Sequence, residues 1–162
     1  MIALLKQGLV QKLVETLRAE RDNADRLARD TAEAANHPEA RPENDKDTRK
    51  LELSYLARGQ AARARELDAT IATLLAQPLR AFAADEAIAL GALVELESAD
   101  KLERVLICSG GGGTSVDDER GTIRIVTPEA PLGRALMGKT AGDEIELVVG
   151  GRKRELVVVS VA

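Results

Sequence analysis

Apolar positions recur at alternating intervals of three and four residues along the first half of the chain, and this spacing predicts two long amphipathic helices. The first helix is expected over about residues 2–35 and the second over about residues 44–76. The apolar stripe expected on the first helix consists of Val10, Leu13, Leu17, Ala24, Leu27 and Thr31. The stripe expected on the second consists of Leu53, Ala57, Gln60, Ala64, Leu67, Ile71 and Leu74.

The segment between the two helices contains Pro38 and Pro42, which cannot continue a helix and therefore predict a break there. Two stripes of matched length on either side of a short turn are typical of an antiparallel coiled-coil hairpin. Each arm would extend about 50 Å at 1.5 Å per residue.

Hydrophobic patterning changes after Gln77 and Pro78, where β-branched runs and most of the glycines begin. Strands are expected over residues 93–96, 103–108, 122–126, 144–149 and 155–161, with a hairpin turn at Gly150 and Gly151. A short helix is expected from Pro131 to Met137. The predicted fold class is α+β: a coiled-coil hairpin over residues 1–77, a linker over residues 78–86 and a small β-rich domain over residues 87–162.

The glycine-rich run from Ser109 to Thr114 is predicted to be a flexible hairpin loop, which Asp117, Asp118 and Glu119 extend as a solvated acidic segment. No lysine follows the glycines, so the run does not fit a phosphate-binding loop.

Composition supports the helical hairpin, because the chain has one Phe, one Tyr and no Trp, which a Leu/Ala coiled coil does not need. The formal net charge of −4 gives no overall electrostatic attraction to nucleic acid. The single cysteine, Cys108, cannot form an internal disulfide, so we expect a cytoplasmic protein. No stretch approaches the roughly 20 apolar residues that span a bilayer, so no membrane partner is expected.

Four carboxylates surround the expected turn between the helices: Glu39, Glu43, Asp45 and Asp47. One interpretation is an ordinary capped helix start, where acidic side chains interact favourably with the helix dipole. The other is that the hairpin presents oxygen ligands to a magnesium ion held elsewhere. We expect no metal site belonging to this chain alone.

Basic residues follow the second helix at Arg49, Lys50, Arg58, Arg63 and Arg65. They are either a solvated face with salt bridges along the helix, or a stripe that contacts nucleic-acid phosphates. His37 and Cys108 have no partners at the spacing of a catalytic triad or a zinc site, which argues against a self-contained enzyme of those classes.

The segment from Val126 to Asp143 resembles the C-terminal motif of the Gre-factor family of bacterial transcript cleavage factors. That motif resembles Ser-Pro, then a helix Leu/Ile-x-Arg-Ala-Leu-x-Gly-Lys, then Gly-Asp before a strand. The matching positions are Pro131, Leu132, Arg134, Ala135, Leu136, Gly138, Lys139, Gly142 and Asp143, whereas Ala130 stands at the family's Ser.

This resemblance implies an FKBP-like C-terminal domain that docks on RNA polymerase through Pro131, Leu132 and Arg134. The hairpin would enter the secondary channel of the polymerase. Its tip would act on backtracked RNA together with the magnesium of the polymerase active site, with no tightly bound cofactor of its own. Arg49, Lys50 and Arg58 would lie near the RNA 3′ end.

At the tip the family pattern resembles Gly-Asp-Leu-x-Glu-Asn-x-Glu-Tyr. Aligning the chain on Glu43 and Asn44 places Ala40 at the family's Asp. Aligning it instead on the downstream arm places Glu43 at that Asp and Lys46 at the family's Glu. Neither register supplies both expected carboxylates, although Glu43 with Asp45 or Asp47 could replace the pair.

Three functions therefore stay open. The first is an elongation factor that binds RNA polymerase and stimulates cleavage of backtracked RNA, without an active site of its own. The second is a Gre-like regulator that occupies the secondary channel without promoting cleavage. The third is a coiled-coil interaction protein unrelated to polymerase. We expect a monomer, although an exposed helical seam could also pair with a second copy.

Overall fold

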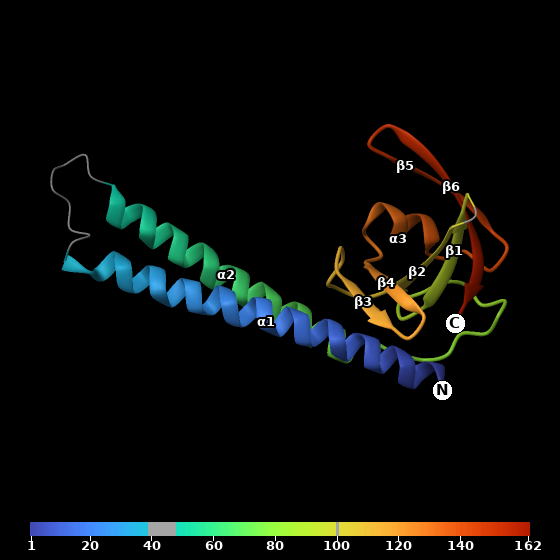
Figure 1. Ribbon diagram of the computed structural model, residues 1–162, viewed down its shortest axis with the longest axis horizontal. Coiled ribbons are helices and arrows are strands. Elements are labelled where there is room, and N and C mark those ends of the chain that lie inside the picture. The colour runs from blue at the N-terminus through green and yellow to red at the C-terminus, as the bar shows by residue number, and fades with distance from the viewer. Residues whose placement is uncertain (39–47, 100) are drawn as a thin grey trace. The chain divides into compact units, whose positions relative to one another are not determined.

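The computed structural model describes residues 1–38, 48–99 and 101–162. The N-terminal half is a long helical hairpin built from α1 (Ile2–Asn36) and α2 (Arg49–Ala76), as Figure 1 shows. The helix expected from residue 44 was wrong at Thr48, which is described and not helical, whereas its end at Ala76 is confirmed. Residues 44–47 lie outside the described residues.

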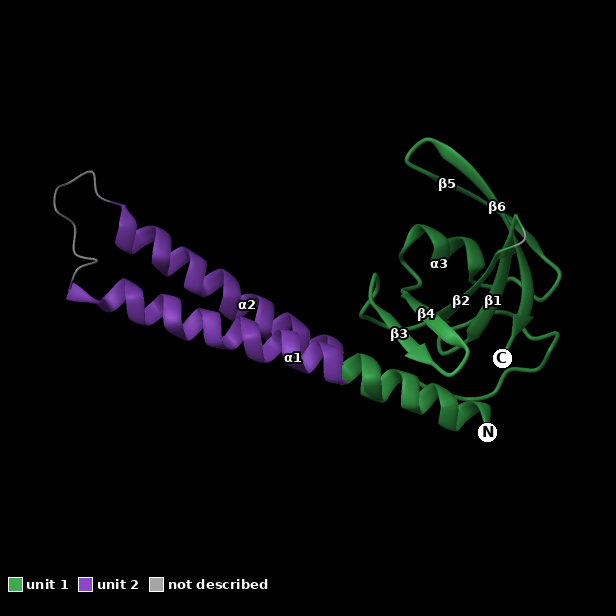
Figure 2. Cartoon of the chain, in the orientation of Figure 1, with its two compact units in different colours: residues 1–14, 72–162 green, residues 15–71 purple. Residues whose placement is uncertain are grey.

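The chain forms two compact units, which Figure 2 shows in different colours. The first unit combines Met1–Val14 with Ala72–Ala162, and the second consists of Glu15–Ile71. The division predicted from the sequence, with a linker over residues 78–86 between the hairpin and the β-rich domain, stays a prediction. Among the residues that the structure describes, no helix is long and apolar enough to cross a membrane.

The second unit buries a narrow seam of mostly small side chains. These are Leu17, Ala24, Ala28 and Ala35 from α1, and Ala57, Ala64, Leu67 and Ile71 from α2. The expected place of Leu27 in the seam was wrong, because its side chain is 41% exposed whereas Ala28 is buried. An α-helix has 3.6 residues per turn, so the buried position drifts from a strict seven-residue repeat.

Two ion pairs join the arms of this unit. Arg21 Nη1 lies 2.6 Å from Asp68 Oδ1, and Arg63 Nη2 lies 3.3 Å from Glu20 Oε2. These side chains are exposed or half-exposed, so water screens each pair and it contributes little to stability. Since the buried alanines also contribute little apolar area, the two helices of the second unit are held together by only a small buried apolar surface.

The first unit contains a six-stranded sheet with the strand order β3-β4-β2-β1-β6-β5. Its strands are β1 (Leu93–Ser98), β2 (Lys101–Ile107), β3 (Ser115–Asp118), β4 (Gly121–Val126), β5 (Glu144–Val149) and β6 (Arg152–Val161). All pairs are antiparallel except β2 with β4. The short helix α3 (Pro131–Leu136) follows β4. The predicted α+β class is confirmed, and the FKBP-like likeness stays a prediction.

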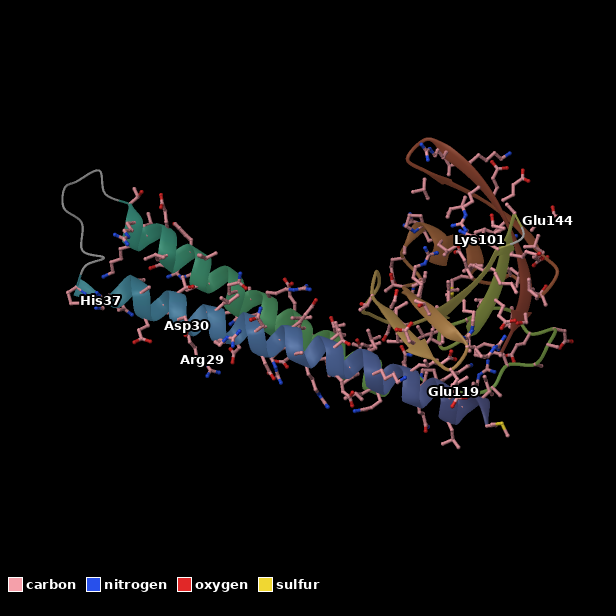
Figure 3. All side chains as sticks on the ribbon, viewed as in Figure 1. Arg29, Asp30, His37, Lys101, Glu119 and Glu144 are labelled. Atoms are coloured by element: carbon pink, nitrogen blue, oxygen red, sulfur yellow. The ribbon has the colours of Figure 1, made fainter. Side chains whose placement is uncertain are left out.

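Strand β3 was missed from the sequence, and the expected solvated acidic loop was wrong at Asp118. Its two carboxylate oxygens each lie 2.6 Å from a guanidinium nitrogen of Arg104, and both side chains are about nine-tenths buried. These hydrogen bonds lower the pKa of Asp118 to about 2. Glu119 is exposed in the two-residue turn between β3 and β4, where Figure 3 labels it.

The glycine-rich run is not a hairpin loop either, because β4 lies between β2 and β3 in the sheet. The run instead carries the chain across β4 from β2 to β3. The first turns of α1 are anchored nearby: Lys12 Nζ donates to the carbonyl oxygen of Asp117 at 2.6 Å. A Cβ on Gly111 would lie 3.0 Å from Leu13 Cδ1, so this glycine permits a close approach. The turn at Gly150 and Gly151 is confirmed, and both residues have positive φ.

One core lies against a face of the sheet. It combines Leu132 and Leu136 of α3 with apolar side chains of β1, β2, β5 and β6, and with Phe82 and Ile88 from the segment before β1. Ile88 N donates to the carbonyl oxygen of Lys139, and Gly138 N donates to that of Ile88. Residues before β1 and after α3 thus close the same end of the core.

Candidate partner-binding site

The start of α3 is fixed by a backbone contact that only glycine permits. Pro131 occupies the first turn, where its missing N–H is not needed. A Cβ on Gly133 would lie 1.9 Å from the carbonyl oxygen of Thr127. Leu132 and Leu136 point into the core, whereas Arg134 is exposed and its Nη1 donates to the carbonyl oxygen of Glu129 at 2.7 Å.

The turns after α3 explain the second part of the sequence motif. Gly138 and Gly142 have φ of 80° and 92°, which L side chains rarely adopt. Asp143 Oδ2 accepts hydrogen bonds from Thr140 N at 2.8 Å and from Thr140 Oγ1 at 3.3 Å. The backbone hydrogen bond from Thr140 lowers the pKa of Asp143. Leu136, Gly138, Gly142 and Asp143 therefore have structural roles.

A cleft of about 670 Å³ opens beside the start of α3. It lies between the β2–β3 loop, strand β4 with the following turn, and the β5–β6 hairpin. Its lining residues are Gly112, Gly113, Arg124, Ile125, Val126, Thr127, Ala130, Pro131, Leu132, Leu147, Val149, Arg152 and Arg154. The cleft walls are mostly apolar and the charged lining residues are all arginines. Such a hollow, apolar with a few polar groups, is the common form of a binding site.

Two of the three arginines that line the cleft pair with one carboxylate. Glu103 on β2 forms ion pairs with Arg154 and, at 3.6 Å, with Arg124. Arg152 is exposed at the end of the β5–β6 turn. Three guanidinium groups against one carboxylate leave the rim of the cleft positive, which favours a ligand with apolar and acidic groups.

The sequence predicted Pro131, Leu132 and Arg134 as partner contacts. Pro131 and Leu132 line the cleft, but Leu132 is only 7% exposed and already packs in the core. Arg134 does not line the cleft. The partner role of all three stays a prediction. Sequence reasoning missed Leu147, Val149 and Arg152, although period-two alternation in the last two strands puts alternate side chains on one face.

The tip carboxylates Glu39, Glu43, Asp45 and Asp47 lie outside the described residues, so their roles also stay predictions. Within residues 1–38, 48–99 and 101–162, no three His, Cys, Asp or Glu side chains gather to hold a metal ion. His37 directly follows the end of α1 (Figure 3). Cys108 is buried, and burial raises the pKa of its thiol to about 11, so the thiol is protonated at neutral pH.

The predicted basic stripe of α2 divides into two kinds of side chain. Arg63 is engaged in ion pairs with Glu20 of α1 and, at 3.9 Å, with Glu66 of its own helix. Arg49, Lys50, Arg58 and Arg65 are exposed. The salt-bridge interpretation thus accounts for Arg63, and the nucleic-acid role of Arg49, Lys50 and Arg58 stays a prediction.

Residues 83–162 match the family described as transcription elongation factor GreA/GreB, C-terminal. This match contains every residue that lines the cleft. The C-terminal domain of the chain therefore belongs to the Gre-factor family. The family resemblance found in residues 126–143 is thereby confirmed.

Solved structures also resemble this chain. GreA factor homolog 1 (Gfh1) of Thermus thermophilus is 23% identical, with 94% of each chain covered and a TM-score of 0.39. Gfh1 of Thermus aquaticus is 22% identical over 93% of this chain and 92% of that chain, with a TM-score of 0.40. GreA/GreB from Nitrosomonas europaea is 20% identical over 61% of this chain and 78% of that chain, with a TM-score of 0.33. Likenesses this distant carry no argument about function, and no curated protein matches the chain.

Proposed function

We propose that this chain is a transcription elongation factor that binds RNA polymerase, inserts its helical hairpin into the secondary channel and stimulates cleavage of backtracked RNA. The observation that carries the proposal is the match of residues 83–162 to the GreA/GreB C-terminal domain, joined to a helical hairpin. The chain contributes no active site of its own. Hydrolysis would use the magnesium of the polymerase. The tip carboxylates would either add ligands to that magnesium or orient the attacking water.

The cleft beside α3 is the proposed docking site on the polymerase. Its apolar floor, formed partly by Leu147 and Val126, would accept apolar side chains, and its arginine rim would pair with nearby carboxylates. Docking through the C-terminal domain would leave the hairpin to reach the RNA 3′ end. A cytoplasmic monomer suits this role.

The experiment uses backtracked complexes of bacterial RNA polymerase with RNA labelled at its 3′ end. Adding the chain should release short labelled fragments, and Glu43→Ala or Asp45→Ala should abolish release without weakening binding. Arg152→Glu should weaken binding about tenfold, because it reverses one rim charge of the cleft. Arg120→Glu is the matched control, since it reverses the charge of an exposed arginine in the same unit that does not line the cleft. Polymerase binding that survives Arg152→Glu would place the docking surface elsewhere.

The departures of the tip sequence from the family pattern favour one second candidate, a regulator that occupies the channel without promoting cleavage. It predicts polymerase binding, slowed elongation and no release of RNA fragments. Fragment release that depends on Glu43 would exclude it. A chain that binds no polymerase in either assay would instead be a coiled-coil interaction protein.

A further inference from the structure

The two edge strands of the sheet, β3 and β5, are protected to different degrees. Strand β3 is only four residues long and carries the carboxylates of Asp117 and Asp118. The ammonium group of Lys12, on α1, donates a hydrogen bond to the carbonyl oxygen of Asp117. Short length and charged side chains are common ways in which proteins keep an edge strand from pairing with another chain. Strand β3 is therefore a protected edge.

Strand β5 lacks these protections. It is the last strand in the order of the sheet, and Figure 1 shows no strand beyond it. Its six residues pair with β6 in one continuous register, and no backbone hydrogen bond joins β5 to another element within the described part of the chain. The strand contains no Lys or Pro, and its last two residues, Val148 and Val149, are 62% and 58% exposed. One edge of β5 is thus open to pairing with a further strand.

The sequence of β5 is complementary to itself in the antiparallel direction. Leu147 and Val149 both face the cleft, and Val148 lies on the other side of the sheet because side chains alternate. Antiparallel pairing of two copies about Val148 sets the two Val148 side chains opposite each other, and each Leu147 opposite Val149 of the second copy. Pairing about Leu147 instead would make the two Glu146 carboxylates diagonal neighbours, which is unfavourable. The pattern therefore favours the register centred on Val148.

The charges of the β5–β6 hairpin favour the same pairing. Strand β5 carries carboxylates at its start, Glu144 and Glu146, whereas β6 begins with Arg152 and Lys153. Antiparallel pairing brings the start of one β5 to the turn of the other hairpin, so Glu144 lies beside Arg152 of the second copy. Neither of these two side chains forms an ion pair within the described part of the chain. A two-fold axis makes this contact twice.

We propose that β5 pairs with β5 of a second copy of this chain, antiparallel about Val148, so that two sheets join into one. The paired segment is short, from Glu146 to Gly150 in each copy, and buries less than the roughly 1,200 Å² of a stable interface. The dimer is therefore weak, with a dissociation constant of about 0.1 mM. This inference goes beyond the proposed function and does not depend on it, since both experiments use the full chain alone.

The first experiment measures the mass of the chain by sedimentation equilibrium. The mass should rise from that of a monomer at about 5 µM toward that of a dimer at about 500 µM. Val148→Lys sets two like charges opposite each other and should weaken the dimer about tenfold. Val159→Lys is the matched control, because it makes the same change at a 41% exposed valine of β6, which is not an edge strand. A chain that stays monomeric at the highest concentration, or a dimer that Val148→Lys leaves unchanged, would overturn the proposal.

The second experiment tests the register by oxidative cross-linking with copper phenanthroline. In the proposed pair the Cα atoms of the two Val148 residues lie about 4.5–5.5 Å apart, within the range of a disulfide. The native Cys108 is buried, so Val148→Cys adds an exposed thiol and should give a covalent dimer on a non-reducing gel. Glu144→Cys is the control, since its two Cα atoms would be about 27 Å apart and should not be bridged. Equal yields from the two variants, or no covalent dimer from Val148→Cys, would show that β5 does not pair in this register.

Discussion

Gly133→Ala tests the tight packing that fixes the start of α3. In the structure, an added Cβ would lie 1.9 Å from Thr127 O, 2.9 Å from Thr127 C and 3.1 Å from Pro128 Cα. All three neighbours are backbone atoms, so α3 must move by more than ~1 Å from the β4–α3 turn to reach ordinary contact. Overpacking of this kind typically costs about 1–3 kcal/mol.

An opposing effect has to be weighed, because alanine favours helices over glycine by about 1 kcal/mol. In a helix of six residues under this clash the packing cost is larger, and we expect the first unit to lose about 2 kcal/mol. Gly59→Ala in α2 is the matched control. A Cβ there meets no atom within 4 Å, so the same substitution should stabilise the hairpin by about 0.5–1 kcal/mol.

Hydrogen exchange read by mass spectrometry separates the two units, since peptides from residues 121–147 and 49–71 report them independently. The expected result is exchange about 30-fold faster in the first set for Gly133→Ala, and slower exchange in the second set for Gly59→Ala. If Gly133→Ala left exchange in residues 121–147 unchanged or slower, helix propensity would outweigh the contact and the reasoning would fail.

Two further predictions concern charged groups of the first unit. Asp118→Asn should cost about 2 kcal/mol at pH 6, because it leaves the buried Arg104 guanidinium without its carboxylate. The pKa of Asp118 is lowered to about 2, so this contribution to stability is present above about pH 4 and is lost as pH falls through 2. The urea midpoints of the unsubstituted chain and of Asp118→Asn should therefore converge as pH falls over that range. Asp117→Asn is the control. Lys6 is buried, and desolvation lowers its pKa to about 8, so the unfolded chain holds more protons between pH 8 and 10.5 and stability should rise with pH there. Lys6→Met should remove this rise in the urea midpoint, whereas an equal rise in both proteins would contradict the assignment.

The elements that the sequence predicted correctly are those whose pattern is local. The 3–4 spacing of Val10, Leu13 and Leu17 needs only one helix to be interpreted, and the paired glycines at 150–151 define their own turn. Leu27 was misplaced because the drift of the seam accumulates over several turns and depends on the partner helix. The type of each element could be predicted from the sequence, whereas the residue that faces the partner at a given turn could not.

Strand β3 shows why non-local structure was missed. Ser115–Asp118 contains one apolar residue, Val116, and two carboxylates, so no local pattern favours a strand. Its stability comes from pairing with β4 and from Arg104, which lies on β2. The cleft was missed for the same reason, since its walls come from segments between residues 112 and 154 that meet only in the folded sheet.

The motif through which the family was recognised describes an architecture more than a contact surface. Gly133 permits a backbone approach, Gly138 and Gly142 permit turns, and Asp143 caps one of them. Substitution of these residues is expected to disturb the fold of the domain, and to affect partner binding only through that change. The exposed groups that a partner can touch, such as Val149 and Arg152, lie on the β5–β6 hairpin outside the motif. A chain can therefore keep the motif and the fold while the wall of the cleft changes. The choice of partner has to be tested by substitutions in the β5–β6 hairpin, and the stability of the domain by substitutions in the motif.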